Sequence, residues 1–561
     1  MRLLGKLVAV LWRVAAAFYL WFTGFFLRRA RYDALEIDLG GPFLEHWLPA
    51  SPLDLRRRSR MTHRELLELL DIAAHDPKIK TVLCRIRPGQ MGLARTQEVG
   101  RALGRVRTAG KKTVALIENA GTREFLLAAR CEKRWIVPTG VLSLTGLNME
   151  MTYLRGLLDK AAVEPDLLVA GKFKSAAETF TRTGASEAAR EMTEGLLDHL
   201  FAQVVGDLAE TLGKKPAQIR KLIDGAPYTP ERALKAGLVE RAGYRDELLK
   251  ELEIKDNRLV PGGRYHRAFA RRVHARAVLI DAPVVALVHI SGAIREGRGD
   301  PGRGLLGASS YVKLLRRLAA DKATKAVVLR VSSPGGSATG SDLIRRELER
   351  LAAKKPLIVS LGDVAASGGY YVAAPGKKIF AERGTLTGSI GVIAGKFDLS
   401  GLYAKFGVNI EAHRRGQAAG IFSSTGRFSA IERARMEEVL GAMYDQFKQA
   451  VAAGRKLPPK RVDELAEGRV WTGAEALASK LADDVGGVAD ALRLAKLEAG
   501  GVEGEPAKVV EYPVMPSPLK MLLALGARTP DPFPVPLPGL EIAQAIAAGP
   551  FMGLPFEIEI K

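Results

Sequence analysis

Short apolar runs alternate with amphipathic segments over most of the chain. Between residues 280 and 375 the runs at 284–290, 326–331 and 357–361 have the length and composition of buried strands. The segments 311–320 and 342–353 carry apolar residues at helical spacing. Strands that alternate with helices predict parallel βαβ units in which helices cover the sheet. We therefore expect an α/β fold.

The same pattern of residues occurs twice along the chain. The sequence KTVLCR at residues 80–85 resembles KAVVLR at residues 325–330, 245 positions later, and Gly146 and Gly391 are separated by the same interval. A shared register of this kind predicts two tandem copies of one domain. The predicted parts are an N-terminal anchor, a first copy, a basic connector, a second copy and a proline-rich, extended tail, over residues 1–34, 35–245, 246–279, 280–500 and 501–561.

The N-terminal segment has the composition of a membrane anchor. Residues 7–27 form an apolar stretch of 21 residues with one charge, Arg13, and a helix of that length reaches about 30 Å. A cleaved signal peptide is the alternative, but Arg13 would interrupt its apolar core. Aromatic residues continue to an arginine cluster at 28–31, as in a retained anchor. We expect one uncleaved transmembrane helix, whose orientation the flanking charges do not determine.

Composition narrows the classes of partner and cofactor. The 561 residues are 47% hydrophobic and 26% charged, which excludes a disordered chain and a single small module. The net charge of +22 favours anionic surfaces, and because no nucleic-acid motif accompanies the basic stretch at 265–276, we expect membrane lipid and no nucleic acid as a partner. Two cysteines, Cys84 and Cys131, exclude a disulfide framework and a cysteine-rich zinc site. We expect no cofactor and no metal.

Candidate chemistry lies at two turns of the second copy. The strand at 326–331 leads into SSPGG at residues 332–336, where glycines would let a backbone N–H approach a ligand. The strand at 357–361 leads into GDVAASGGY, so Ser367 precedes a helix that we expect to begin at Tyr370. A hydroxyl beside free amides at a helix start suits a nucleophile that forms an oxyanion. The alternative is that Ser367 merely caps the helix.

A nucleophilic serine needs a base, and the repeat indicates a lysine. None of the eight histidines lies in a recognisable triad motif. Lys174 of the first copy aligns with Ala419 of the second, whereas Thr122 of the first copy aligns with Ser367. These complementary losses are expected if one Ser–Lys site is divided between the copies. Lys174 can act as a base only if burial lowers its pKa by several units from about 10.4.

Four motifs in this order resemble the long form of signal peptide peptidase A, a family of membrane-anchored serine proteases with tandem Clp-protease/crotonase-like domains. The motifs are KSAAE, SPGG, ASGGY and LTGSIG at residues 174–178, 333–336, 366–370 and 386–391. The resemblance implies Ser367 as the nucleophile, Lys174 as the general base and Ser389 as a hydroxyl that holds the lysine amine. It also implies oxyanion donors at Gly368 and at the Gly335 turn.

The expected function is a membrane-anchored serine endopeptidase that hydrolyses extended apolar peptides, and the resemblance implies cleaved signal peptides as substrates. Substrate backbone is expected to add to a sheet edge while apolar pockets take alternate side chains. The resemblance further implies a homo-oligomer, a tetramer, in the bacterial inner membrane with the catalytic copies on the extracytoplasmic side. Two alternatives stay open: an inactive membrane scaffold, and a crotonase-type acyl-CoA enzyme, which would not need a serine beside a lysine.

Overall fold

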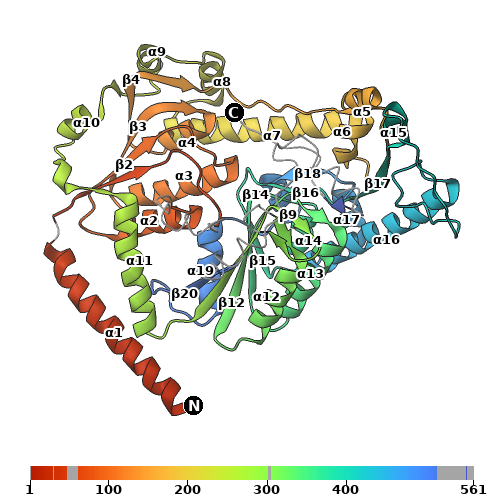
Figure 1. The fold of residues 1–561 in the computed structure, drawn as a ribbon. Coiled ribbons are helices and arrows are strands. Elements are labelled where there is room, and N and C mark those ends of the chain that lie inside the picture. The colour runs from red at the N-terminus through yellow and green to blue at the C-terminus, as the bar shows by residue number, and fades with distance from the viewer. Residues whose placement is uncertain (1, 30, 47–60, 301–304, 515–550, 553–561) are drawn as a thin grey trace.

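The structure is a computed structural model that describes residues 2–29, 31–46, 61–300, 305–514 and 551–552. Two α/β halves lie side by side, the N-terminal half mainly in red to yellow and the C-terminal half in green to blue (Figure 1). Each half contains a sheet with a parallel core, and a third sheet combines strands from both halves. The predicted α/β class is correct, and the chain consists of tandem duplicated domains.

The first sheet lies in the N-terminal half. Its six strands are parallel in the order β6-β4-β3-β2-β1-β7. The strands are β1 (Ala34–Asp38), β2 (Thr81–Ile86), β3 (Lys112–Gly121), β4 (Lys133–Ser143), β6 (Arg241–Ala242) and β7 (Leu259–Pro261). Leu83 and Val82 face opposite sides of β2 and are both fully buried, as expected for a parallel sheet that is covered on both faces.

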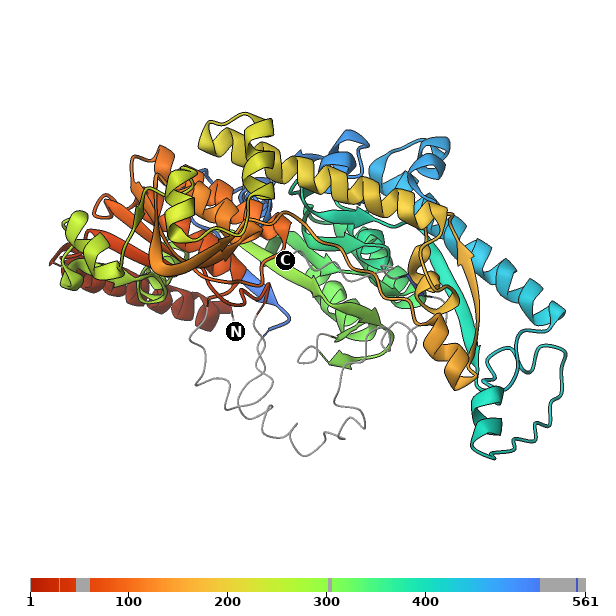
Figure 2. The same cartoon turned by 90° about the horizontal axis from the view of Figure 1, so that it is seen from above.

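Helices pack against this sheet and extend beyond it. They are α2 (His63–His75), α3 (Leu93–Thr108), α4 (Thr122–Ala129), α5 (Arg155–Ala161), α6 (Glu178–Thr181), α7 (Glu187–Leu212), α8 (Pro216–Asp224), α9 (Pro230–Lys235) and α10 (Arg245–Glu251). Ser186 caps α7 by accepting a hydrogen bond from the amide of Ala189. From this cap α7 runs along both halves, contacting α4 of the first and β18 (Val470–Thr472) of the second (Figure 2). The helix therefore bridges the two halves.

The second sheet belongs to the C-terminal half. Its path is β18-β16-β14-β12-β8-β20, and off this path β15 pairs with β14 while β19 pairs with β15. Its other strands are β8 (Val284–Ser291), β12 (Thr324–Ser333), β14 (Leu357–Ala366), β15 (Lys378–Ala381), β16 (Leu386–Gly388), β19 (Asp484–Val485) and β20 (Lys508–Tyr512). The helices of this half are α12 (Ala308–Ala320), α13 (Ala338–Ala352), α14 (Gly368–Ala373), α15 (Ser400–Lys405), α16 (Ala430–Arg455), α17 (Pro459–Leu465), α18 (Gly473–Ala478) and α19 (Val488–Glu498).

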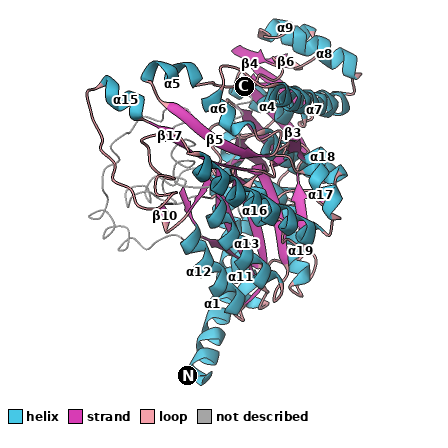
Figure 3. Cartoon of the chain, turned by 90° about the vertical axis from the view of Figure 1, so that its right-hand side faces the viewer, coloured by secondary structure: helices cyan, strands magenta, loops and turns pink. Residues whose placement is uncertain are grey.

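The third sheet crosses the boundary between the halves. Its order is β10-β11-β9-β13-β21-β17-β5, formed by β5 (Glu164–Ala170), β9 (Ala293–Arg295), β10 (Gly299–Asp300), β11 (Leu305–Gly307), β13 (Gly336–Ser337), β17 (Val392–Asp398) and β21 (Phe551–Met552). First-half strand β5 pairs antiparallel with second-half strand β17 along their whole length, from Ala170 opposite Val392 to Glu164 opposite Asp398 (Figure 3). The main chain of the first half is thereby built into the second.

The element order reflects the predicted repeat. Strands β3 and β14 have the same length and lie 245 residues apart, and α3 and α13 begin at the same interval. One buried hydrophobic cluster contains residues of both halves, including Leu103 of the first with Val285 and Ala491 of the second. The two halves are therefore joined by a common hydrophobic cluster as well as by a common sheet. The exact domain boundaries stay a prediction.

The N-terminal helix and the connector lie beside each other. Helix α1 (Arg2–Arg29) contacts α11 (Gly262–Leu279), which contains the basic stretch of the connector (Figure 1). Arg13 forms an ion pair with Asp281 at 2.9 Å, and the guanidinium of Arg272 donates to Thr23 Oγ1 at 2.8 Å. Within the residues that the structure describes, none of the helices combines the length and apolar content that a membrane crossing requires.

Two predicted element boundaries were wrong. Strand β14 continues to Ala366, so residues 362–366 are not a loop, and α14 begins at Gly368 rather than at Tyr370. The reason is tertiary, because this extension of β14 pairs with β16 and places Ala366 opposite Gly388. In the tail, β20 pairs with β8 in parallel. Most of the tail, including the prolines from 516 to 538, lies outside the described residues.

Candidate active site between the two halves

Ser367 occupies a sharp turn between β14 and α14. Its φ and ψ are +53° and −119°, a conformation that side chains rarely adopt and that the surroundings must hold. The amide of Ser367 donates to the carbonyl oxygen of Gly388 at 2.7 Å, and its own carbonyl accepts from Tyr371 N–H at 2.8 Å. The residue is fully buried. Backbone bonds thus fix the hydroxyl at the start of a helix.

Lys174 reaches this hydroxyl from the first half. It follows β5 and precedes a short 3₁₀ turn (Ser175–Ala177), and only 2% of it is exposed. Its Nζ lies 2.7 Å from Ser367 Oγ, 2.9 Å from Ser389 Oγ and 3.1 Å from the carbonyl oxygen of Ser389. The structure therefore brings together all three residues that the sequence proposed for the Ser–Lys site.

Glycines leave the space that the lysine side chain fills. A Cβ on Gly468, which has φ +74°, would lie 2.5 Å from the Cβ of Lys174, and one on Gly391 would lie 3.1 Å from its Cδ. A Cβ on Gly171, at φ +111°, would lie 2.6 Å from the main chain of Glu467. These contacts explain why Gly391, the last residue of the LTGSIG motif, and the turn before Lys174 carry no side chain.

Burial sets the protonation of the lysine. Desolvation lowers the pKa of Lys174 well below that of a free lysine, because the charged amine loses its hydration in this interior position. The described partners of Nζ are two hydroxyls and a carbonyl, which are neutral acceptors. An uncharged amine beside Ser367 Oγ has the lone pair that a general base needs.

The two predicted oxyanion positions, Gly368 and the Gly335 turn, are neighbours, but their amides differ in whether they already donate a hydrogen bond within the turn. A Cβ on Gly368 would lie 3.2 Å from the Cα of Gly335 and 3.3 Å from the nitrogen of Gly336, so the two turns meet next to Ser367. The amide of Gly335 donates to Ser333 Oγ at 3.2 Å. Gly368, at the first position of α14, lies on the helix N-terminus, whose dipole favours a developing negative charge.

A profile of Peptidase family S49 matches two segments, residues 105–258 and 349–501, which together make up more than half of the chain. The chain belongs to peptidase family S49. The two matches fall one in each half, in agreement with the duplicated fold. Their order and spacing agree with the long, tandem form that the sequence motifs resemble.

Individual relatives agree with this assignment. A chloroplastic serine protease SPPA of Arabidopsis thaliana is 33% identical over 455 residues, which cover 80% of this chain and 67% of that protein. Protease 4 of Salmonella typhi is 32% identical over 421 residues, covering 71% and 66%. A protein of Enterococcus faecium, named provisionally as a signal peptide peptidase SppA, is 37% identical over 206 residues, covering 36% and 58%. This S49 chain is a serine protease.

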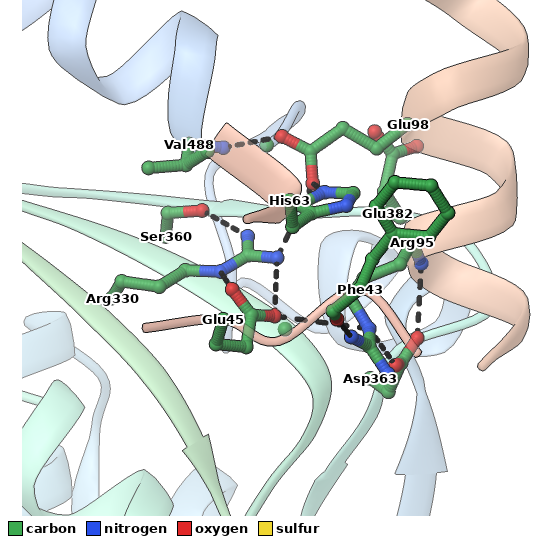
Figure 4. A network of polar contacts seen from close by, with 12 residues as sticks. Phe43, Glu45, His63, Arg95, Glu98, Arg330, Ser360, Asp363, Glu382 and Val488 are labelled. Carbon is green, nitrogen blue, oxygen red and sulfur yellow. Dashed lines mark hydrogen bonds and ion pairs between the residues drawn. The ribbon is translucent and has the colours of Figure 1, made fainter. Parts of the chain in front are cut away.

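A buried polar network joins the halves of this S49 protease (Figure 4). Arg330 on β12, 1% exposed, binds the carboxylate of Glu45 at 2.9 and 3.0 Å and Ser360 Oγ at 2.7 Å. Glu98 on α3 accepts from Arg330 at 3.3 Å and lies 2.8 Å from His63 Nε2. Burial alone would raise the pKa of Glu98, but the charges of Arg330 and His63 lower it to about 2.

The same network holds β14, the strand that leads into Ser367. Asp363 lies on β14, four residues before Ser367, and its carboxylate accepts hydrogen bonds from the amides of Gly92 and Arg95 at 3.1 and 2.9 Å (Figure 4). The guanidinium of Arg95 binds the same carboxylate. The N-terminus of first-half helix α3 thus clasps second-half strand β14. The sequence analysis missed this network, although Arg330 and Asp363 are charged residues within otherwise apolar strands.

A second polar cluster consists of His46, His289 and Glu511. His46 and His289 stack with ring centroids 4.6 Å apart, and His289 Nε2 lies 3.2 Å from the carboxylate of Glu511. Their nitrogen and oxygen atoms fall within 4.8 Å of one another, a spacing that a metal ion could bridge. Arg64 also binds Glu511, at 2.6 Å, so that the carboxylate is already neutralised by a protein cation. The expectation of no metal is therefore neither supported nor opposed by this cluster.

Proposed function

We propose that the chain is an endopeptidase in which Ser367 is the nucleophile, Lys174 the general base and Ser389 the residue that orients the lysine amine. The observation that carries this proposal is the 2.7 Å contact between Lys174 Nζ and Ser367 Oγ in a buried site. It joins a strained strand-to-helix serine to an amine whose pKa burial lowers. Nucleophile, base and orienting group are the three parts of an activated nucleophile.

The reaction follows from these positions. Neutral Lys174 takes the proton of Ser367 Oγ as the oxygen attacks a peptide carbonyl, and the amide of Gly368 stabilises the oxyanion. The protonated lysine gives its proton to the leaving amine, which leaves an ester on Ser367. Lys174 then takes a proton from water, whose oxygen attacks the ester, and returns that proton to Ser367. Ser389 Oγ, 2.9 Å from Nζ, keeps the amine aligned through both steps.

The proposed substrates are extended apolar peptides, with cleaved signal peptides as the natural class. The provisional name of the Enterococcus relative supports this class. The location proposed is the bacterial inner membrane, with α1 as a single-pass anchor and the catalytic halves on the extracytoplasmic side. Exposed aromatic residues on α1, including Trp12, Phe18 and Trp21, support contact with lipid. Carbonate extraction of membranes checks this part, because an anchored chain stays in the pellet and a peripheral chain is released.

Assembly into a tetramer completes the proposal. The segment after β17 carries large apolar side chains on its surface, among them Phe406 and Phe422, which are 77% and 75% exposed. Exposed apolar groups of this size favour contact with another protein surface. Light scattering of the purified chain in detergent measures the mass, and a monomer would contradict this part without touching the catalytic proposal.

A serine-directed probe tests the catalytic proposal. A fluorophosphonate should label the wild-type chain at Ser367, and Ser367→Ala should abolish labelling and peptide hydrolysis. Thr122→Ala is the matched control, because Thr122 holds the equivalent position of the first half. It should keep both signals. Labelling that persists in Ser367→Ala would show that another residue is the nucleophile, and a folded wild-type chain without labelling or hydrolysis would favour the inactive scaffold.

A further inference from the structure

A short segment between α17 and β18 makes hydrogen bonds to both sides of the Ser–Lys site. On one side, the amide of Phe173 donates to the carbonyl oxygen of Glu467 at 2.7 Å. On the other side, the amide of Ser389 donates to the carbonyl oxygen of Arg469 at 2.7 Å. This second-half segment therefore joins the first-half turn that precedes Lys174 to the turn that carries the hydroxyl partner of the lysine.

The side chain of Glu467 makes a second contact with the lysine turn. The amide of Lys172 donates to Oε2 of Glu467 at 2.9 Å. Tyr444 on α16 holds the same glutamate, because its hydroxyl accepts from the Glu467 amide at 3.0 Å and donates to Oε1 at 3.4 Å. The two residues that precede Lys174 are thus both bound to Glu467, one through its carboxylate and one through its carbonyl group.

The main chain of Glu467 has an unfavourable conformation. Its φ is +57°, in the left-handed region where glycine is favoured and a residue with a Cβ is strained. The side chain is exposed, so burial of apolar area does not compensate for this strain. Strained residues persist where the surrounding structure holds them, and they concentrate at functional sites. A glycine here would remove the strain, but it would lack the contact with the amide of Lys172.

The equivalent residue of the first copy makes no such contact. Tyr228 of the first half and Trp471 of the second half pair antiparallel with β4 and with its counterpart β16. Four residues before these aromatic residues lie Asp224 and Glu467. Asp224 ends α8, and its carboxylate makes no hydrogen bond or ion pair among the residues that the structure describes. Both copies thus carry an acidic residue at this position, but only the one beside Lys174 binds a neighbouring turn.

We propose that Glu467 is a positioning residue that fixes the turn before Lys174 and thereby sets the place of the base between Ser367 and Ser389. This inference rests on the proposed endopeptidase function and adds a residue to it. Glu467 acts through the main chain of the lysine turn and does not contact the reacting atoms. Its two hydrogen bonds keep the lysine amine within reach of both hydroxyls, at 2.7 and 2.9 Å.

A further contact limits how far the turn can move when Glu467 is changed. The guanidinium of Arg469 lies 4.8 Å from the ring centre of Phe173 and 5.1 Å from that of Trp471, and it pairs with Glu191 at 2.9 Å. Such a cation beside two rings holds the turn independently of the carboxylate. A displacement of about 1 Å can lower a rate by about a hundred-fold, so we expect a smaller loss, of about ten-fold, from the partly held turn.

Steady-state kinetics on an apolar peptide, fluorophosphonate labelling rates and thermal unfolding of the full chain test this role. Glu467→Ala should lower kcat and the labelling rate by about ten-fold with KM little changed, because the base moves while substrate contacts stay. Glu467→Gln keeps an oxygen that accepts from the Lys172 amide and should stay within about two-fold of the wild-type kcat. Asp224→Ala is the matched control and should keep the wild-type kcat.

Glu467→Gly separates positioning from stability. It removes the same carboxylate as Glu467→Ala but adopts the positive φ without strain. The glycine variant should therefore unfold at a higher temperature than the alanine variant while losing as much activity. A residue that acted only on stability would give the glycine variant more activity than the alanine variant.

The outcomes distinguish this inference from the function on which it rests. A Glu467→Ala chain with the wild-type kcat overturns the positioning role and leaves the endopeptidase proposal intact. Equal losses in Glu467→Ala and Glu467→Gln also overturn it, because the charge and not the hydrogen bond would then matter. Activity that follows the unfolding temperature across the three variants overturns it as well. A folded wild-type chain that neither reacts with fluorophosphonate nor cuts a peptide contradicts the endopeptidase proposal itself.

Discussion

The two copies place different residues at the same turn and use them in opposite ways. In the second copy Ser367 turns its hydroxyl toward Lys174. In the first copy Thr122, 245 residues earlier, donates its hydroxyl to the carbonyl of Gly146 at 2.9 Å and accepts from the Gly146 amide at 3.2 Å. Both hydrogen bonds of the threonine hydroxyl go to the backbone of Gly146, so the hydroxyl stabilises the turn. The fold of the turn is thus separable from its chemistry.

The strand that delivers the lysine shows the reverse difference. Lys174 follows β5, whereas the equivalent Ala419 lies in an irregular segment between α15 and α16. First-half residues 147–153, which align with β17, likewise form no strand. Each copy has kept one strand of a pair, and the two retained strands bond to each other. Duplication here has produced one site from two incomplete ones.

The largest expected effect separates the two turns by activity. Ser367→Ala and Lys174→Ala should each lower kcat by at least about a thousand-fold, because each removes an atom that takes part in the reaction. Lys174→Arg should be equally inactive, since a guanidinium does not lose its proton in proteins. Thr122→Ala should keep kcat but lower the free energy of unfolding by about 1–3 kcal/mol, because Gly146 loses a buried partner. Steady-state kinetics and denaturant unfolding measure the two effects. An active arginine variant would show that Lys174 is not the base.

A matched pair of arginines tests how differently the copies use a charge. Arg330→Ala should lower the free energy of unfolding by about 3–5 kcal/mol, because it leaves Glu45 and Glu98 buried without their cation. Arg85 holds the equivalent position of the first copy, but it is one-third exposed and pairs with Glu118 near solvent. Arg85→Ala should therefore cost about 1 kcal/mol or less. Similar losses in the two variants would contradict the role assigned to the network in joining the halves.

The lowered pKa of Lys174 predicts that both the rate and the stability rise with pH. Only the neutral amine accepts a proton, so kcat/KM should rise with pH through the lowered pKa of Lys174. The unfolded chain binds a proton on this lysine that the folded chain has released, so stability should rise with pH between the lowered pKa and about 10.4. Lys174→Met should remove this dependence and stabilise the protein at pH 7 by about 1.4 kcal/mol for each unit by which the pKa of Lys174 lies below about 10.4, counted no further down than pH 7. A variant as stable as wild type across this pH range would contradict the lowered pKa.

The smallest expected effect is an absence of recovery. Lys174 and Ser367 meet within one chain, so oligomers that mix Ser367→Ala chains with Lys174→Ala chains should contain no intact site. Co-expression with two different affinity tags isolates the mixed assemblies. Their peptide hydrolysis should equal the sum of the single variants. Substantial recovered activity would show that β5 exchanges between chains, and that pairing of the copies is not confined to one molecule.

Local patterns in the sequence were sufficient for the fold class and the repeat, and they also selected Ser367 and Lys174, which the structure places in contact. Strand–helix alternation and the shared interval can be read directly from the sequence. Ser367 could be selected because it lies beside glycines at a predicted turn. The pairing of β5 with β17 could not be predicted, because each strand bonds to a partner more than 200 residues away. The pattern of residues within a strand does not indicate which distant strand it pairs with. The extension of β14 beyond residue 361 depends on β16 in the same way.

The buried network escaped sequence reasoning for a related reason. Arg330 reads as the polar end of an apolar run, and only the fold places Glu45 and Glu98 around it. The position of Met552 is a further example, since an apolar dipeptide in a proline-rich tail carries no local sign of its pairing with Gly336.

The pairing of β5 with β17 also sets the moment during synthesis at which proteolysis becomes possible. A nascent chain that ends before residue 392 contains both Lys174 and Ser367 but lacks the strand on which β5 aligns. Gly468, whose main chain borders the lysine, is made later still. Most of the chain must therefore be synthesised before the site can cut a peptide bond. Because the two halves complete each other, the active site forms only late in synthesis. An incomplete chain is therefore not yet an active protease in the cell that makes it.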